Sequence, residues 1–234
     1  MDSRPTGSSR PSLLGMEIRR SFWMGRVFLA VSFAYTLLFQ TILILAGSGA
    51  FDTTVPLLLP IFSVVGAMGS LSVYSSDRIK GVFEYLMAYG FTPQRLFLDV
   101  LLAGLTMVSL VVGVSLAFGV GLYVATGHTV SATLVELLVI YTIPMSYASV
   151  AFATTVGMYW TSLSSPRAGM NSPVGIVPFI GIAPSLLTLA ALGLVHAPAA
   201  AILGLAVLLV TVTVVVLLRS IGRLLPRERL LSPA

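Results

Sequence analysis

Cysteine is absent from this chain of 234 residues, and charged residues are scarce. Without cysteine the chain has no disulfide, no thiolate nucleophile and no cysteine-ligated metal site. Charged residues make up 9% of the chain and apolar residues 57%, whereas soluble domains carry about 25% charged residues. The composition therefore excludes an ordinary soluble globular protein and predicts a chain that resides in a membrane.

Residues that bind nucleotides or carry out catalysis are also rare. Lys80 is the single lysine, and no Gly-x-x-x-x-Gly-Lys-Ser/Thr loop is present to hold phosphates. The two histidines, His128 and His196, fall in predicted turns. Neither accompanies a Gly-x-Ser-x-Gly motif or a cluster of acidic residues, so a serine hydrolase or a zinc site is not expected. The sequence thus predicts that this chain is not an enzyme and holds no cofactor or metal of its own.

Long apolar stretches predict six membrane-spanning helices. A spanning helix needs about 20 apolar residues to cross a hydrocarbon core of about 30 Å. Two turns, Thr126-Gly127-His128 and His196-Ala197-Pro198, divide the longest stretches. The predicted spans are 26–47, 55–75, 95–125, 133–158, 174–194 and 199–218. The predicted fold class is therefore all-α and polytopic, with a disordered tail at 1–12 and a single six-helix domain at 13–234.

The basic residues favour this topology and give it an orientation. With six spans, all 13 lysines and arginines fall on one side of the membrane, whereas five or seven spans would scatter them. Loops rich in lysine and arginine stay in the cytoplasm, so both termini are expected there, in a multi-pass protein of the cell membrane. The net charge of +5 is then explained by topology and by anionic lipid, and no nucleic-acid partner is expected.

A first amphipathic segment precedes the first span. Leu14, Ile18 and Phe22 recur every four residues, with Arg19 and Arg20 on the opposite side. This pattern predicts an interface helix on the cytoplasmic face of the membrane. We expect a sharp turn at 24–26, a Met-Gly-Arg sequence, where the chain enters the bilayer.

A second amphipathic segment lies between spans two and three. Ile79, Val82, Phe83, Leu86 and Met87 follow the spacing of one apolar helix face. The segment predicts a short cytoplasmic helix at about 77–89, three turns long. An alternative is an interfacial helix that only anchors the loop among lipid head groups.

The ends of this segment carry helix-terminating residues. Ser76 or Asp77 can cap its start, and Gly90 suits the left-handed turn that ends a helix. Thr92 can cap the next helix, with Pro93 at its first position, where a missing N–H costs nothing.

Small residues recur at intervals of four in two of the predicted spans. Such residues let helices approach closely, and we expect most of them to serve packing within the bundle. They are Ser109, Gly113, Ala117 and Gly121 in span three, and Ser149, Ala153 and Gly157 in span four.

The order of these parts resembles the membrane subunits of ABC-2 type transporters. The resemblance covers the N-terminal amphipathic helix, the six spans with both ends inside, and the helix between spans two and three. It also covers a loop motif, which this chain matches at Asp77, Arg78, Gly81, Val82, Phe83, Glu84, Leu86, Thr92 and Pro93.

The resemblance implies an ATP-driven transporter, most simply an exporter. The helix at 77–89 would be a coupling helix that docks on a separate cytoplasmic ABC ATPase, present in two copies, which binds ATP and Mg. A second permease subunit, most simply a second copy of this chain, would complete the transporter. The ATPase-coupling residues expected from the resemblance are Asp77, Arg78, Lys80, Gly81, Phe83, Glu84, Leu86 and Met87.

Within that set, apolar and polar residues have different expected roles. Phe83, Leu86 and Met87 are candidate apolar knobs, although the same face can rest on the bilayer. Arg78, Lys80 and Glu84 are candidate polar contacts. Lys80 and Glu84 are also spaced for a plain ion pair within the helix, worth a few tenths of a kcal/mol.

Two other classes of protein remain open alternatives: a non-transporting scaffold or assembly factor of the same architecture, and an intramembrane enzyme. No ionisable residue is predicted at the middle of a span, which argues against an ion-coupled transporter. Short outer loops and an apolar interior favour a hydrophobic or amphipathic cargo, whose identity the sequence does not specify.

Overall fold

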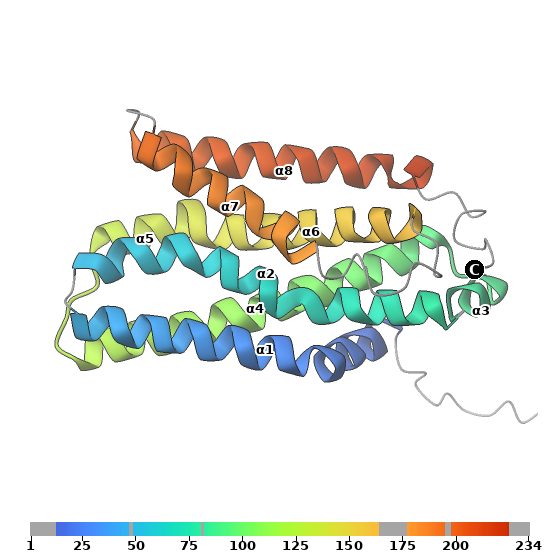
Figure 1. Cartoon of the computed structure of the whole chain (residues 1–234), viewed down its shortest axis with the longest axis horizontal. Helices are drawn as coiled ribbons and strands as arrows, with labels where there is room; N and C mark the ends of the chain where they lie inside the picture. The colour runs from blue at the N-terminus through green and yellow to red at the C-terminus, as the bar shows by residue number, and fades with distance from the viewer. Residues whose placement is uncertain (1–12, 47–48, 81, 164–176, 195–197, 225–234) are drawn as a thin grey trace, which may run out of the picture.

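All regular structure in the described part of the chain is helical. The computed structural model describes residues 13–46, 49–80, 82–163, 177–194 and 198–224. The elements are α1 (Leu13–Ala46), α2 (Gly49–Ile79), α3 (Val82–Ala88), α4 (Pro93–Ala125), α5 (Ala132–Leu137), the π-helical η1 (Leu138–Thr142), α6 (Ile143–Leu163), α7 (Val177–Leu194) and α8 (Ala199–Leu224) (Figure 1). The predicted all-α class is confirmed.

Five of the described helical segments are long and apolar enough to cross a membrane. They are Leu14–Leu45, Phe51–Tyr74, Gln94–Ala125, Ala132–Gly157 and Ala199–Arg219. The apolar part of α7, Phe179–Leu194, is shorter. Five described helices thus have the length and composition of candidate membrane spans, and a sixth span would depend on α7.

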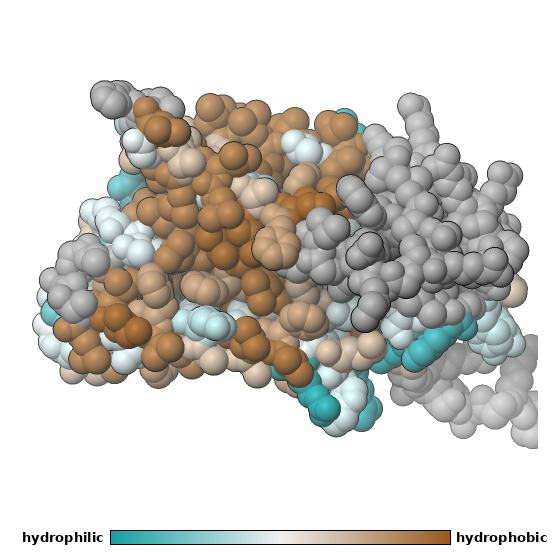
Figure 2. Space-filling view, viewed as in Figure 1, coloured by the Kyte–Doolittle hydropathy of each residue, from teal (hydrophilic) through white to brown (hydrophobic). Residues whose placement is uncertain are grey.

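The long helices lie side by side, and their polar ends gather at one end of the bundle. In Figure 1, the start of α1, the end of α2, α3, the start of α4 and the end of α8 all lie at the same end. The described arginines belong to these segments, and Lys80 lies in the turn between α2 and α3. Figure 2 shows a broad apolar surface over the middle of the helices. Among the described residues, positive charge is thus gathered at one end of the bundle, as the sequence predicts.

The turn predicted at 24–26 is not formed, because α1 continues through it as a helix. Gly25 is buried against Gly69 of α2, and a Cβ built on Gly25 would lie 2.6 Å from the Gly69 Cα. The two glycines therefore let the backbones of α1 and α2 come into contact. Gly25 serves this helix crossing rather than a chain reversal.

The small residues of α4 behave differently from the prediction. Ser109, Gly113, Ala117 and Gly121 are all exposed, and a Cβ on either glycine would meet nothing within 4 Å. The prediction that this stripe packs within the bundle is wrong, because α4 turns its opposite face toward the other helices. The hydroxyl of Ser109 is within 2.7 Å of the Tyr147 hydroxyl of α6, at the edge of that surface.

The small residues of the fourth predicted span are buried, as expected. A Cβ on Gly181 of α7 would lie 2.7 Å from the Ala153 Cβ and 3.6 Å from the Ser149 carbonyl oxygen. Close packing of α6 against α7 thus uses Ser149 and Ala153. This contact places α7 within the bundle.

Proline inside α2 is compensated by a side chain from the π-helical segment. Pro60 has no N–H, so the Pro56 carbonyl one turn earlier loses its ordinary partner in the helix. The Thr142 hydroxyl of η1 donates to that carbonyl over 2.9 Å, at a site with no exposure. A buried carbonyl in a membrane needs such a partner. The contact holds η1 against α2, and η1 itself continues directly from α5 into α6.

Candidate functional site

The segment between α2 and α4 forms a two-turn helix rather than the predicted three turns. Residues 77–79 continue α2, and the Lys80 N–H still donates to the Ser76 carbonyl oxygen over 3.1 Å. The separate helix, α3, covers only Val82–Ala88. The prediction that Ser76 or Asp77 caps a new helix is therefore wrong, since both lie inside α2.

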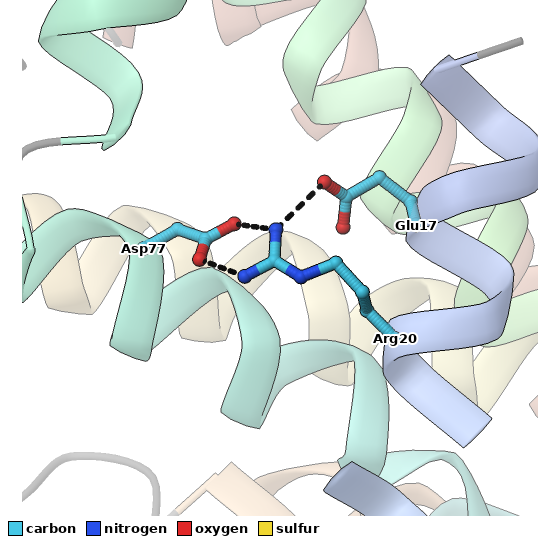
Figure 3. Close-up of polar contacts among 3 residues, drawn as sticks. All are labelled: Glu17, Arg20 and Asp77. Atoms are coloured by element: carbon cyan, nitrogen blue, oxygen red, sulfur yellow. Dashed lines mark hydrogen bonds and ion pairs between the residues drawn. The ribbon is translucent and has the colours of Figure 1, made fainter. Parts of the chain in front are cut away.

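Asp77 instead forms an ion pair with α1. Its side chain is buried, with 1% of the residue exposed. Both carboxylate oxygens accept hydrogen bonds from the Arg20 guanidinium: Nη1 lies 2.7 Å from Oδ2, and Nη2 contacts Oδ1 (Figure 3). A bidentate ion pair of this kind fixes both the position and the orientation of the two side chains. Asp77 thus ties the end of α2 to α1, 57 residues earlier in the chain.

Glu17 completes this polar contact from the preceding turn of α1. Its Oε1 lies 3.6 Å from Arg20 Nη1, and its side chain is 10% exposed. The Arg20 side chain is 40% exposed, so its cation reaches water while both acidic partners are largely buried. We call Glu17, Arg20 and Asp77 the Arg20 clasp. The Arg20 clasp therefore links the start of α1 to the end of α2.

One face of α3 is inserted into the protein itself. Met87 is 2% exposed and belongs to the main apolar core, together with Leu96 and Phe97 of α4. Leu86 is partly buried against the same core. The predicted apolar face therefore exists at these two residues, but it points inward. In this conformation Met87 is not accessible to a partner, because α3 uses it to seat on the bundle.

Two exposed tyrosines with tilted rings lie on the opposite side of α3: Tyr85 within the helix and Tyr89 directly after its last residue. Tyr85 and Tyr89 are 62% and 69% exposed, and their ring centroids lie 4.6 Å apart. The Tyr85 hydroxyl donates to the Tyr89 hydroxyl over 3.2 Å. This hydrogen bond raises the pKa of Tyr85, because ionisation would remove the donated proton.

The tyrosine pair was missed as a functional candidate from the sequence. The signal that marks it is present, since Tyr85 and Tyr89 are spaced i, i+4 and must share a helix face. The apolar face predicted for this segment instead points to the neighbouring Leu86 and Met87. Exposed tyrosines combine apolar area with a polar tip, which is typical of contact surfaces.

The chain after α3 turns sharply into α4 as predicted. Gly90 has φ +88°, a conformation that favours glycine, and its N–H donates to the Met87 carbonyl oxygen over 3.0 Å. The Thr92 side chain accepts from the Arg95 N–H over 3.3 Å, with Pro93 in the first turn. The short turn sets the direction of α3 relative to α4.

The remaining predicted coupling residues are placed only in part. Lys80 is exposed in the turn that follows α2. Gly81 lies outside the described residues, as do the side chains of Arg78, Phe83 and Glu84. The predicted ion pair between Lys80 and Glu84 therefore stays a prediction. Among the described residues no three His, Cys, Asp or Glu side chains are grouped to hold a metal ion.

Comparisons with known proteins do not assign this chain to a family. No family model, curated protein or solved structure matches it. Its function is therefore argued from the Arg20 clasp, the seating of α3 and the exposed tyrosine pair.

Proposed function

We propose that this chain is the membrane subunit of an ATP-driven transporter of the ABC-2 type, in which α3 contacts a separate ATPase. The observation that carries the proposal is α3 itself. It is a short helix at the positively charged end of the bundle, seated by Met87 and presenting Tyr85 and Tyr89 outward. A membrane protein has no need of such an element for crossing the bilayer.

The connections of α3 would let it act as a lever. Toward α2, Asp77 lies five residues before the start of α3 and is held by Arg20 of α1. Toward α4, the Gly90 turn is short and the helix begins at Pro93. A displacement of α3 would therefore act on α1, α2 and α4 together, because rigid packed elements transmit strain.

The other parts of the proposal follow from this role. Since the sequence has no phosphate-binding loop, ATP and Mg would be bound by the partner, a cytoplasmic ABC ATPase in two copies. Two ATPases call for two membrane subunits, most simply a homodimer of this chain with six spans each. The positively charged end would face the cytoplasm, with both termini. The cargo would be hydrophobic or amphipathic and would be exported.

A scaffold or assembly factor is the second candidate, and the tyrosine pair is what favours it. Tyrosines concentrate where a membrane meets water, with the ring among lipids and the hydroxyl in water. In that case Tyr85 and Tyr89 would anchor α3 among head groups and would contact no ATPase. The two candidates predict different effects of removing the tyrosines: a transporter loses affinity for its ATPase, whereas a scaffold does not.

The test is to reconstitute the chain in lipid with an ABC ATPase encoded beside it and to measure complex formation and ATP hydrolysis. We expect Tyr85→Ala with Tyr89→Ala to weaken the complex about tenfold or more, as loss of a central aromatic contact does. Tyr35→Ala is the matched control, because Tyr35 is equally exposed but lies on the apolar part of α1. Unchanged affinity and hydrolysis in the double variant would favour the scaffold.

A further inference from the structure

An apolar groove of about 350 Å³ lies between α6, α7 and α8. Its wall is formed by Phe152 of α6, by residues of α7 around Pro184 and Ala191, and by one face of α8 that includes Ala206. The volume is at the lower end of the range for small-molecule sites. Nothing in the proposed contact with an ATPase uses this groove.

The chemistry of the lining restricts what can bind. All of the lining residues except two threonines are apolar. The Thr188 hydroxyl donates to the Pro184 carbonyl oxygen and the Thr213 hydroxyl to the Leu209 carbonyl oxygen, each over 2.8 Å. No lining side chain therefore has a free hydrogen-bond donor. Water is a poor occupant of such a site, whereas apolar molecules bind readily.

The position of the groove identifies the apolar molecule. Its rim is formed by Leu187, Leu205 and Leu209, each more than half exposed. Its α8 wall belongs to the candidate span that is the most apolar and the least buried of the five. The groove is thus continuous with the surface that faces the hydrocarbon core, where lipid chains are the surrounding medium.

We propose that this groove binds one acyl chain of a bilayer phospholipid between α7 and α8. The proposal rests on the membrane placement of the helices and holds whether or not the chain has an ATPase partner. A bound chain fills the space that α7 and α8 leave between them.

The test uses fluorescence quenching by bromine atoms on lipid acyl chains. Trp23 and Trp160, the two tryptophans of the chain, are changed to phenylalanine. A single tryptophan then replaces either Phe152, which lines the groove and is only partly exposed, or Phe118, which is exposed on α4. The purified chain is reconstituted in phosphatidylcholine with and without brominated chains.

We expect brominated lipid to quench Phe152→Trp as strongly as Phe118→Trp. Adding Ala206→Phe fills the groove and should return Phe152→Trp to nearly unquenched emission without affecting Phe118→Trp. Ala201→Phe is the matched control on α8, because Ala201 is exposed and does not line the groove. Circular dichroism and gel filtration check that each variant folds.

Two results would overturn the proposal. If brominated lipid leaves Phe152→Trp unquenched in the variant with an unfilled groove, no lipid chain enters. If Phe152→Trp is unquenched and Leu205→Cys forms disulfide-linked dimers in the same vesicles, the groove is occupied by a second copy of the chain. The absence of native cysteine makes that cross-link unambiguous. Neither result depends on ATP hydrolysis, so failure here is distinct from failure of the proposed transporter.

Discussion

At the scale of single residues, the two sides of the Arg20 clasp have unequal access to water. Asp77 is almost fully buried, whereas the Arg20 side chain is 40% exposed. Removing Asp77 leaves a cation that water and Glu17 can still stabilise. Removing Arg20 leaves the buried Asp77 carboxylate without its partner. This change is expected to reduce the stability of the protein more.

Arg20→Ala is therefore expected to destabilise the chain by about 3 kcal/mol, and Asp77→Ala by clearly less. Chemical or thermal unfolding in detergent measures both, with Arg19→Ala as the control for loss of a positive charge at an exposed position of α1. The double variant should be less destabilised than the sum of the two single variants. Equal and additive losses would mean that the clasp contributes no specific pairing energy.

Glycines in this chain differ sharply in what surrounds them. A Cβ on Gly69 would lie 2.5 Å from the Ser21 carbonyl oxygen and 2.6 Å from the Gly25 Cα, both backbone atoms that cannot rotate away. A Cβ on Gly113 would meet nothing within 4 Å. Both glycines are helical, so local propensity is the same at the two sites.

Gly69→Ala should therefore cost about 1–3 kcal/mol or more by separating α1 from α2. Gly113→Ala should be neutral or slightly stabilising, by up to about 1 kcal/mol, because alanine favours helix. Unfolding in detergent compares the two variants. A tolerated Gly69→Ala would contradict the close crossing of α1 and α2.

At the scale of elements, the π-helical segment η1 has a definable structural role. It brings the Thr142 hydroxyl to the Pro56 carbonyl, which Pro60 leaves without a partner. The contribution of Thr142 to stability is therefore expected to depend on the presence of Pro60 in α2. A double-mutant cycle can separate this dependence from the ordinary cost of each substitution.

Thr142→Val is expected to cost about 1–2 kcal/mol, because it leaves a buried carbonyl unsatisfied. In a Pro60→Ala background, the residue at position 60 regains an N–H, and the same substitution should cost much less. The free energies of unfolding of the four proteins give the coupling. Ser146→Ala serves as a control, since its hydroxyl donates to the Thr142 carbonyl oxygen one turn earlier in the chain rather than to the Pro56 carbonyl. Identical costs in both backgrounds would refute the compensation.

The connection around α3 shows which structural features the sequence could reveal. Gly90, Thr92 and Pro93 were predictable because a left-handed turn and a helix cap are decided by neighbouring residues. The start of α3 was not, since Asp77 is held in α2 by an arginine 57 residues away. No local pattern contains that information. The predicted length and the predicted cap failed for this reason.

The distinction between features set by neighbouring residues and features set by distant ones also applies to the candidate site and to helix packing. Helical spacing placed Leu86 and Met87 on one face correctly, but could not say whether that face meets the bundle or a partner. Likewise, a stripe of small residues marks a smooth helix face without showing what lies against it. Gly113 faces outward and Gly69 faces a backbone, although both are glycines in apolar helices.

At the scale of the whole molecule, the number of crossings depends on α7. Its described apolar part is shorter than the five candidate spans. If it crosses, six spans place the end of α8 on the same side as α3. If it does not, those two segments lie on opposite sides of the membrane, although Figure 1 shows them at the same end of the bundle.

Single cysteines in this cysteine-free chain can decide the topology. We expect Lys80→Cys and Arg219→Cys to react with a membrane-impermeant maleimide only after the membrane is opened, because both lie at the positively charged end. Thr129→Cys, in the exposed turn after α4, should react in intact cells. Labelling of Arg219→Cys in intact cells would show five crossings instead of six.

The proposed function depends on a contact between α3 and a separate ATPase, made by Tyr85 and Tyr89. A photo-crosslinking amino acid at position 89, introduced in living cells, tests it most directly, with the same amino acid at Tyr35 as the lipid-facing control. We predict that position 89 cross-links to a polypeptide with a phosphate-binding loop and that position 35 does not. Adducts with lipid alone at position 89 would rule out this contact with an ATPase.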